Sequence, residues 1–127
     1  MAYKVFISST LKDIDLARDL SRRLKELGID VYSVDKAAVP GEASFNKTTV
    51  DLGRADEVLL ILTDGSVDNP NLMYELGAAT SLRKRVTPVI VGLDTSKLPS
   101  LIKNMNYVKY PDLPQYISDL EKRVKAA

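Results

Sequence analysis

The chain contains no cysteine, no histidine and no tryptophan among its 127 residues. Without cysteine it has no disulfide, no thiolate zinc ligand and no cysteine nucleophile. Without histidine it has no imidazole base and no side chain that ordinarily titrates near neutral pH. Any catalysis must therefore use carboxylates, hydroxyls, lysines or backbone dipoles.

Charge of one sign and long hydrophobic runs are also missing. The 18 basic and 17 acidic side chains give a net charge of +1, so no global attraction to nucleic acid or to a membrane surface is expected. No segment approaches the roughly 20 apolar residues of a spanning helix, and the apolar stretch at the N-terminus is too short for a signal peptide. We therefore expect a cytoplasmic protein without nucleic-acid or membrane partners.

The chain has the size and composition of one domain. With 45% hydrophobic residues, 127 residues can bury roughly two-thirds of the unfolded surface without metals or crosslinks. No internal repeat, low-complexity segment or linker interrupts it. We expect one domain over residues 1–127.

Apolar runs of strand length alternate with stretches of helical periodicity along the chain. Gly28 stands at the expected end of one helix, and Asn69 with Pro70 marks the start of another. Residues 36–44 and 97–99 are predicted as loops. The predicted strands are Tyr3–Ser8, Ile29–Val34, Glu57–Thr63, Val86–Val91 and Asn106–Lys109, and the predicted helices are Asp13–Leu27, Phe45–Arg54, Pro70–Arg83 and Pro114–Val124.

This alternation predicts an α/β fold with a parallel sheet. Five βα units are too few for a closed barrel, which needs eight. The expected architecture is a three-layer, flavodoxin-like, doubly wound sheet of five parallel strands in the order 2-1-3-4-5, with helices on both faces. Its ligand crevice lies beyond the carboxyl ends of the first and third strands. Residues 8–10, the loop around Pro40 and Gly41, and the turn 63–71 should border it.

Glu75 is the leading candidate for chemistry. It falls in the apolar stripe of its helix, among Leu72, Leu76, Ala79 and Leu82. Burial disfavours a charged carboxylate, so this group needs hydrogen bonds, a cation or a ligand. Because it lies within the first turns of the helix, the positive end of the helix dipole favours its ionised form.

Two interpretations of this carboxylate are open. In the structural one, it pairs with Arg54, Lys84 or a backbone amide. In the functional one, it faces the crevice together with the hydroxyls of Ser8, Ser9 and Thr10. A carboxylate among hydroxyls, without a positive clamp, is more typical of a sugar-binding site than of a phosphate-binding site.

The familiar phosphate-binding motifs are absent. There is no glycine-rich dinucleotide fingerprint and no P-loop, and the turn after the first strand contains no glycine. A phosphoacceptor receiver domain would use Asp64, just after the third strand. It would also need acidic metal ligands after the first strand, where Ser8 and Ser9 stand.

Three segments together resemble the Toll/interleukin-1 receptor (TIR) domain family and its bacterial and archaeal relatives. Phe6–Asp13, with the sequence Phe-Ile-Ser-Ser-Thr-Leu-Lys-Asp, is similar to the first box of the family. Asp35 with Pro40 and Gly41 is similar to the BB loop. Asn69–Ala79 is similar to the segment that contains the glutamate of the members that cleave NAD. The resemblance spans nearly the whole chain.

The resemblance implies an NAD+ nucleosidase, a hydrolase of the nicotinamide–ribose bond, in which Glu75 matches the catalytic glutamate. A carboxylate stabilises the oxocarbenium-like centre of such a reaction. The leaving nicotinamide is neutral, so no strong general acid is required. NAD is the substrate, and neither a metal nor a cofactor is expected.

The resemblance also implies substrate contacts near the crevice. Asn71 stands four residues before the glutamate, where many NAD-cleaving members have a tryptophan, and Phe45 is suited to stacking. The implied substrate-binding residues are Ser8, Ser9, Thr10, Lys36, Phe45 and Asn71.

Two alternatives remain within the same architecture. Some TIR domains are non-catalytic signalling adaptors that self-associate, and association with other TIR domains is expected in either case. Nucleoside 2-deoxyribosyltransferases also place a glutamate in a Glu-Leu-Gly context, as a nucleophile. They usually open with an Ala-Gly-Pro turn, whereas this chain has Ser-Ser-Thr at residues 8–10.

Overall fold

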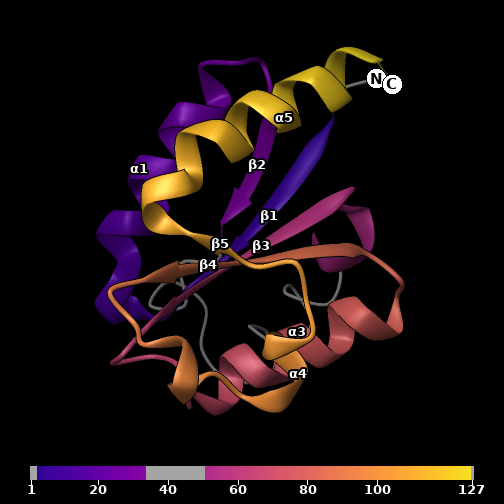
Figure 1. Cartoon of the computed structure of the whole chain (residues 1–127). Coiled ribbons are helices and arrows are strands. Elements are labelled where there is room, and N and C mark those ends of the chain that lie inside the picture. The colour runs from indigo at the N-terminus through magenta and orange to yellow at the C-terminus, as the bar shows by residue number, and fades with distance from the viewer. Residues whose placement is uncertain (1–2, 34–50, 127) are drawn as a thin grey trace.

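The computed structural model describes residues 3–33 and 51–126. Its strands all run parallel in one five-stranded sheet with the order β2-β1-β3-β4-β5 (Figure 1). This order confirms the predicted doubly wound, flavodoxin-like topology. The strands are β1 (Lys4–Ser8), β2 (Asp30–Ser33), β3 (Glu57–Thr63), β4 (Arg85–Val91) and β5 (Val108–Lys109).

Helices cover both faces of the sheet, as expected. The long helices α1 (Ile14–Lys25) and α5 (Leu113–Ala126) lie on one face, and α3 (Pro70–Ser81) with the short α4 (Ser100–Lys103) lies on the other (Figure 1). None of the helices in the described ranges is long and apolar enough to cross a membrane. The described residues also include helical residues 51–54 and the short 3-10 helices η1 (Leu11–Asp13), η2 (Thr95–Lys97) and η3 (Tyr110–Asp112).

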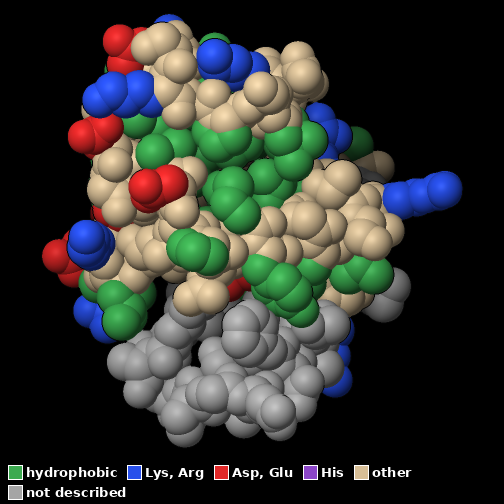
Figure 2. Space-filling model, turned by 90° about the horizontal axis from the view of Figure 1, so that it is seen from below, with side chains coloured by type: hydrophobic (Ala, Val, Ile, Leu, Met, Phe, Trp, Pro, Cys, Tyr) green, Lys and Arg blue, Asp and Glu red, His purple; other side chains and the backbone are tan. Residues whose placement is uncertain are grey.

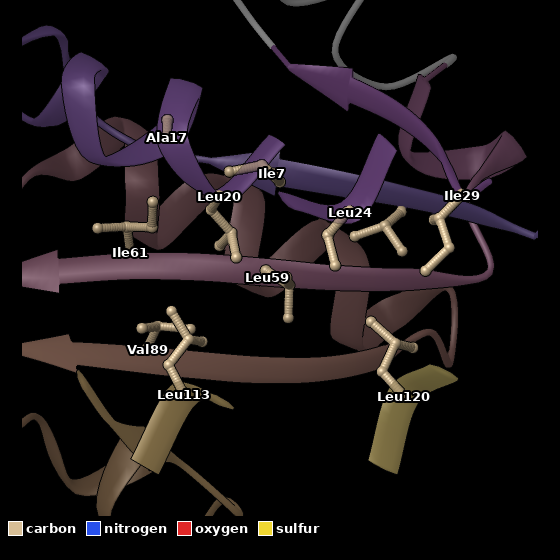
Figure 3. Close-up of a cluster of buried hydrophobic side chains, with 11 residues drawn as sticks. Ile7, Ala17, Leu20, Leu24, Ile29, Leu59, Ile61, Val89, Leu113 and Leu120 are labelled. Atoms are coloured by element: carbon tan, nitrogen blue, oxygen red, sulfur yellow. The ribbon is translucent and has the colours of Figure 1, made fainter. Parts of the chain in front are cut away.

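The central strand β3 is buried on both faces. Leu59 and Ile61 pack against α1 and α5, in the cluster drawn in Figure 3. Leu60 and Leu62 point the other way and pack against α3 and α4. A strand covered on both faces needs a continuous apolar run rather than an alternating one. This is why the sequence predicts both ends of β3 correctly.

The start of α3 also follows the prediction. The Asn69 side chain accepts hydrogen bonds from the backbone amides of Asn71 (2.9 Å) and Leu72 (3.3 Å), and Pro70 occupies the first helical position. These contacts satisfy backbone donors that the first turn of a helix leaves without a partner. They fix where α3 leaves the sheet edge.

The end of α3 corrects the prediction. The helix stops at Ser81, not at Arg83, and Leu82 is 47% exposed instead of facing the sheet. Arg83 adopts a left-handed conformation with φ of 57°, and the Lys84 amide donates to the carbonyl of Ala79 (3.0 Å). This closing pattern turns the chain away from the helix before Leu82 reaches the core.

Other predicted boundaries differ or cannot be compared. Residues 97–99 were predicted as a loop; residues 98 and 99 belong to no helix or strand, whereas Lys97 is the last residue of η2. The short η2 and α4 were not predicted, because so few residues give no readable helical period. The predicted loop 36–44 lies outside the described residues, as does most of the predicted helix 45–54, of which residues 51–54 are helical.

Glu57 is a fully buried carboxylate at the amino end of β3, and the sequence gives no warning of it. Its Oε1 atom accepts from Arg123 of α5 (2.8 Å) and lies 3.2 Å from Nε of Arg85. Burial raises the pKa of Glu57, while the positive charges of Arg123 and Arg85 oppose that rise. The two arginines therefore stabilise the buried charge, and Arg123 attaches α5 to the amino edge of the sheet.

Arg123→Met is expected to destabilise the protein by about 3 kcal/mol at pH 7, because it removes one cation from a buried carboxylate. A carboxyl group with a raised folded-state pKa contributes stability below its unfolded pKa and loses it as pH rises through the folded pKa. Removing Arg123 raises the pKa of Glu57 further, so the destabilisation should shrink near the ordinary value of 4.5. Urea unfolding at both pH values measures this, and an equal loss at both would contradict it.

Candidate active site

The alternation of side chains along β1 brings a hydroxyl to the carboxyl end of the sheet. Val5 and Ile7 point toward α1 and α5, whereas Phe6 packs with Ala79 of α3 on the opposite face. Ser8 is two residues beyond Phe6 and therefore lies on the α3 side. It is the last residue of β1 and is 1% exposed.

Glu75 meets this hydroxyl from the helix. It lies on the buried side of α3 with Leu72, Leu76 and Ala79, and it is 2% exposed. The Ser8 hydroxyl donates a hydrogen bond to Oε2 of Glu75. The structure thus joins the two predicted site residues that are 67 positions apart in the sequence.

This hydrogen bond orients the carboxylate. A donor that bonds one oxygen of a buried carboxylate fixes the rotation of the group. Lys84, which the structural interpretation offers as a partner, instead donates to the backbone carbonyl of Gly53 (3.0 Å). Arg54 is exposed.

The other predicted site residues differ in their placement. Ser9 is buried and its hydroxyl makes no hydrogen bond within the described residues, while the Thr10 hydroxyl donates to Asp13 (3.3 Å) and not to Glu75. Asn71 is exposed one helical turn before Glu75. Two predicted substrate contacts lie outside the described residues, namely Lys36 and Phe45.

The profile of the TIR domain family matches residues 5–124. The chain belongs to the TIR domain family. No curated protein sequence matches it.

Solved structures share the fold of this TIR domain at low sequence identity. A prokaryotic SEFIR domain is 22% identical with a TM-score of 0.67, over 97% of this chain and 99% of that chain. The TIR domain of a Toll-related receptor from Hydra magnipapillata is 16% identical with a TM-score of 0.76, over 98% and 99% of the two chains. A CMP N-glycosidase from Clostridium botulinum is 18% identical with a TM-score of 0.67, over 93% and 98%.

Sequence reasoning missed a second polar group of this TIR domain at the same sheet edge. Asp13 is 8% exposed, and its carboxylate accepts from the hydroxyl of Thr63 at the end of β3. Ser66, in the turn that follows, is fully buried and contacts Thr63. The position of Asp13 in the first-box segment was the signal from which its role could have been predicted.

Within residues 3–33 and 51–126, no group of acidic side chains is arranged to hold a metal ion.

We expect Ser8→Ala to lower the free energy of unfolding by about 1–3 kcal/mol, because it removes a buried hydrogen bond to a charged acceptor. Ser9→Ala is the matched control and should change stability by less than about 0.5 kcal/mol. A double-mutant cycle with Glu75→Gln isolates the pairwise term. Additive effects of the two substitutions would show that the Ser8–Glu75 bond contributes nothing.

Proposed function

We propose that this TIR domain hydrolyses the nicotinamide–ribose bond of NAD, with Glu75 as the catalytic carboxylate. The observation that supports the proposal most directly is the buried carboxylate of Glu75, oriented by Ser8 at the carboxyl edge of a doubly wound sheet. This edge, at the switch between β1 and β3, is where such folds bind ligands. A buried anion there suits a substrate that develops positive charge during the reaction.

The reaction suits the side chains that the chain possesses. In NAD, the bond between ribose C1′ and the pyridinium nitrogen breaks and its electron pair stays on that nitrogen, so nicotinamide leaves neutral. The cationic centre at C1′ is stabilised by the carboxylate of Glu75. Water then adds to C1′ and loses its proton to that carboxylate and then to solvent. No protonated leaving group is needed, which fits a chain without histidine.

The buried hydroxyls support the same substrate. Ser8 holds Oε2 of Glu75, and Ser9 lies next to it in the chain with a hydroxyl that makes no hydrogen bond within the described residues. Hydroxyls beside a carboxylate complement the ribose hydroxyls of a dinucleotide. Asn71 is exposed one turn earlier on α3, and we propose that it contacts the substrate.

One of the fold neighbours acts on a nucleotide, which makes CMP an alternative substrate to consider. The Clostridium botulinum protein is a CMP N-glycosidase, and it shares the fold at 18% identity. Cytosine is a poorer leaving group than nicotinamide unless it is protonated. Because this TIR domain has no histidine to protonate the base, we favour NAD as its substrate, and CMP and a deoxynucleoside are the comparison substrates.

The purified protein is expected to release nicotinamide from NAD, and Glu75→Gln should lower kcat by at least about 100-fold, the scale for removing one charge-stabilising group. Glu26→Gln is the matched control, because Glu26 is an exposed carboxylate on the far end of α1 that pairs with Arg22. Its rate should equal that of the wild type. Chromatographic quantification of nicotinamide measures both.

Release of cytosine from CMP in place of nicotinamide would move the proposal to a nucleotide N-glycosidase. Equal rates for the wild type and a folded Glu75→Gln variant would exclude Glu75 as the catalytic group. Absence of turnover with all three substrates over a wide range of protein concentration would overturn the enzymatic proposal and favour the adaptor function.

Self-association is the second function that we propose, and a specific surface supports it. Apolar side chains gather on the face that α3 and α4 form (Figure 2). Tyr74 of α3 and Leu101 of α4 are large exposed hydrophobic residues, and Leu101 is 54% exposed. A contiguous apolar patch on a small domain commonly marks an interface. A TIR domain heterodimer is among the fold neighbours.

Leu101→Glu is expected to raise the dissociation constant of self-association at least tenfold, about 1.4 kcal/mol, because it places a charge in an apolar contact. Ser118→Glu adds the same charge to an exposed position on α5 and should leave association unchanged. Sedimentation over a range of concentrations measures both. A wild-type chain that stays monomeric throughout, or equal effects of the two substitutions, would contradict an interface on α3 and α4.

A further inference from the structure

Three hydroxyl-bearing residues from two separate segments form a part-buried polar cluster with Asp13. Oγ1 of Thr63 lies 3.2 Å from Oδ1 and 3.0 Å from Oδ2 of Asp13, and Oγ1 of Thr10 lies 3.3 Å from Oδ2. Oγ of Ser66 is 3.1 Å from Oγ1 of Thr63 and accepts from the Thr63 amide at 2.9 Å. We call these four residues the Asp13 cluster.

The ordinary role of an aspartate at this position is absent. Asp13 is the N-cap residue of α1, yet its side chain makes no capping hydrogen bond. A cap aspartate normally accepts from an amide of the first turn, which stabilises the helix by about 1 kcal/mol. Here the carboxylate gives up that contact and reaches a residue 50 positions away. Helix capping therefore does not account for the orientation of the Asp13 side chain.

The direction of the hydrogen bonds depends on the carboxylate. An ionised carboxylate only accepts, so the Thr63 hydroxyl must donate to Asp13. The lone pairs of Thr63 Oγ1 are then left to accept from the hydroxyl of Ser66. Ser66 Oγ in turn accepts from the Thr63 amide. The charged carboxylate of Asp13 thus fixes the direction of the successive hydrogen bonds at the end of β3.

The Asp13 cluster lies between the two halves of the active site. Thr10 is two residues beyond Ser8, so the cluster holds the loop that leaves β1. Ser66 lies in the turn 64–68 that leads into α3, and its carbonyl accepts from the amide of Asn69, the N-cap of that helix (3.0 Å). Any shift of one loop against the other changes the spacing of Ser8 and Glu75.

We propose that Asp13 is a positioning residue that sets the alignment of Ser8 and Glu75 by joining the β1–α1 loop to the β3–α3 turn. The effect on turnover rests on the proposed function, whereas the effect on the Ser8–Glu75 bond does not. Small displacements of a catalytic group are costly, since an error of about 1 Å lowers a rate by about 100-fold. Asp13 acts through Glu75 and makes no contact with substrate in this account.

Asp13→Asn is the first test, because it keeps the shape of the side chain and replaces an acceptor oxygen by a donor. The double-mutant cycle between Ser8→Ala and Glu75→Gln is repeated in this background by urea unfolding. Its coupling should fall at least twofold. Wild-type coupling in the Asp13→Asn background would overturn the proposal, whether or not the protein hydrolyses NAD.

Thr63→Val and Thr63→Ser are a matched pair that separates positioning from general stability. Valine has the shape of threonine without the hydroxyl, so the Ser8–Glu75 coupling should fall as it does for Asp13→Asn. Serine keeps the hydroxyl and should restore wild-type coupling. This pair decides the proposal if Asp13→Asn fails to fold, and equal coupling in the two variants would overturn it.

The kinetic readout distinguishes a positioning residue from a binding residue. Asp13→Asn and Thr63→Val should lower kcat for nicotinamide release at least tenfold and change KM less than threefold, while Thr63→Ser keeps the wild-type kcat. A rise in KM at unchanged kcat would contradict positioning. If the wild type shows no turnover, the proposed function fails, and the coupling measurements still decide the role of Asp13.

Discussion

The structure of the site depends on one requirement, that the buried carboxylate of Glu75 receive a hydrogen bond from the end of β1. A carboxylate removed from water is strongly destabilised unless the protein replaces its hydration. Ser8 supplies a donor, and it can do so only because β1 neighbours β3 and α3 returns along the same face of the sheet. The strand order thus determines which two distant segments meet. The chemistry proposed for Glu75 is a consequence of the topology and of one serine at the end of a strand.

Two buried glutamates of this TIR domain, Glu57 and Glu75, show how surroundings assign different roles to one residue type. Glu57 lies at the amino edge of the sheet, where Arg123 and Arg85 neutralise it and attach α5. Glu75 lies at the carboxyl edge, where the Ser8 hydroxyl orients its carboxylate. A carboxylate that is already paired with two guanidinium groups gives little electrostatic stabilisation to a cationic transition state. Glu75 instead lies at the edge where doubly wound folds bind ligands, which is why we propose catalysis there.

How much the sequence predicts depends on how local the determining physics is. The continuous apolar run of β3 and the Asn69–Pro70 start of α3 are local patterns, and both were predicted correctly. The end of α3 was wrong because Arg83 adopts a left-handed conformation that residues other than glycine rarely take. Glu57 escaped notice because its partners lie in distant segments. Asp13 was assigned to the start of a helix, and only the tertiary structure places Thr63 beside it. The catalytic role of Glu75 stays a prediction.

A crystal structure of the folded Glu75→Gln variant with NAD bound tests the central claim most directly. In that complex, C1′ of the nicotinamide ribose is expected to lie roughly 3–3.5 Å from the side chain at position 75, the separation of reacting groups. The ribose hydroxyls are expected to face Ser8 and Ser9. A dinucleotide bound away from the carboxyl edge of β1 and β3, or one whose adenine half occupies this position, would contradict the assignment of Glu75.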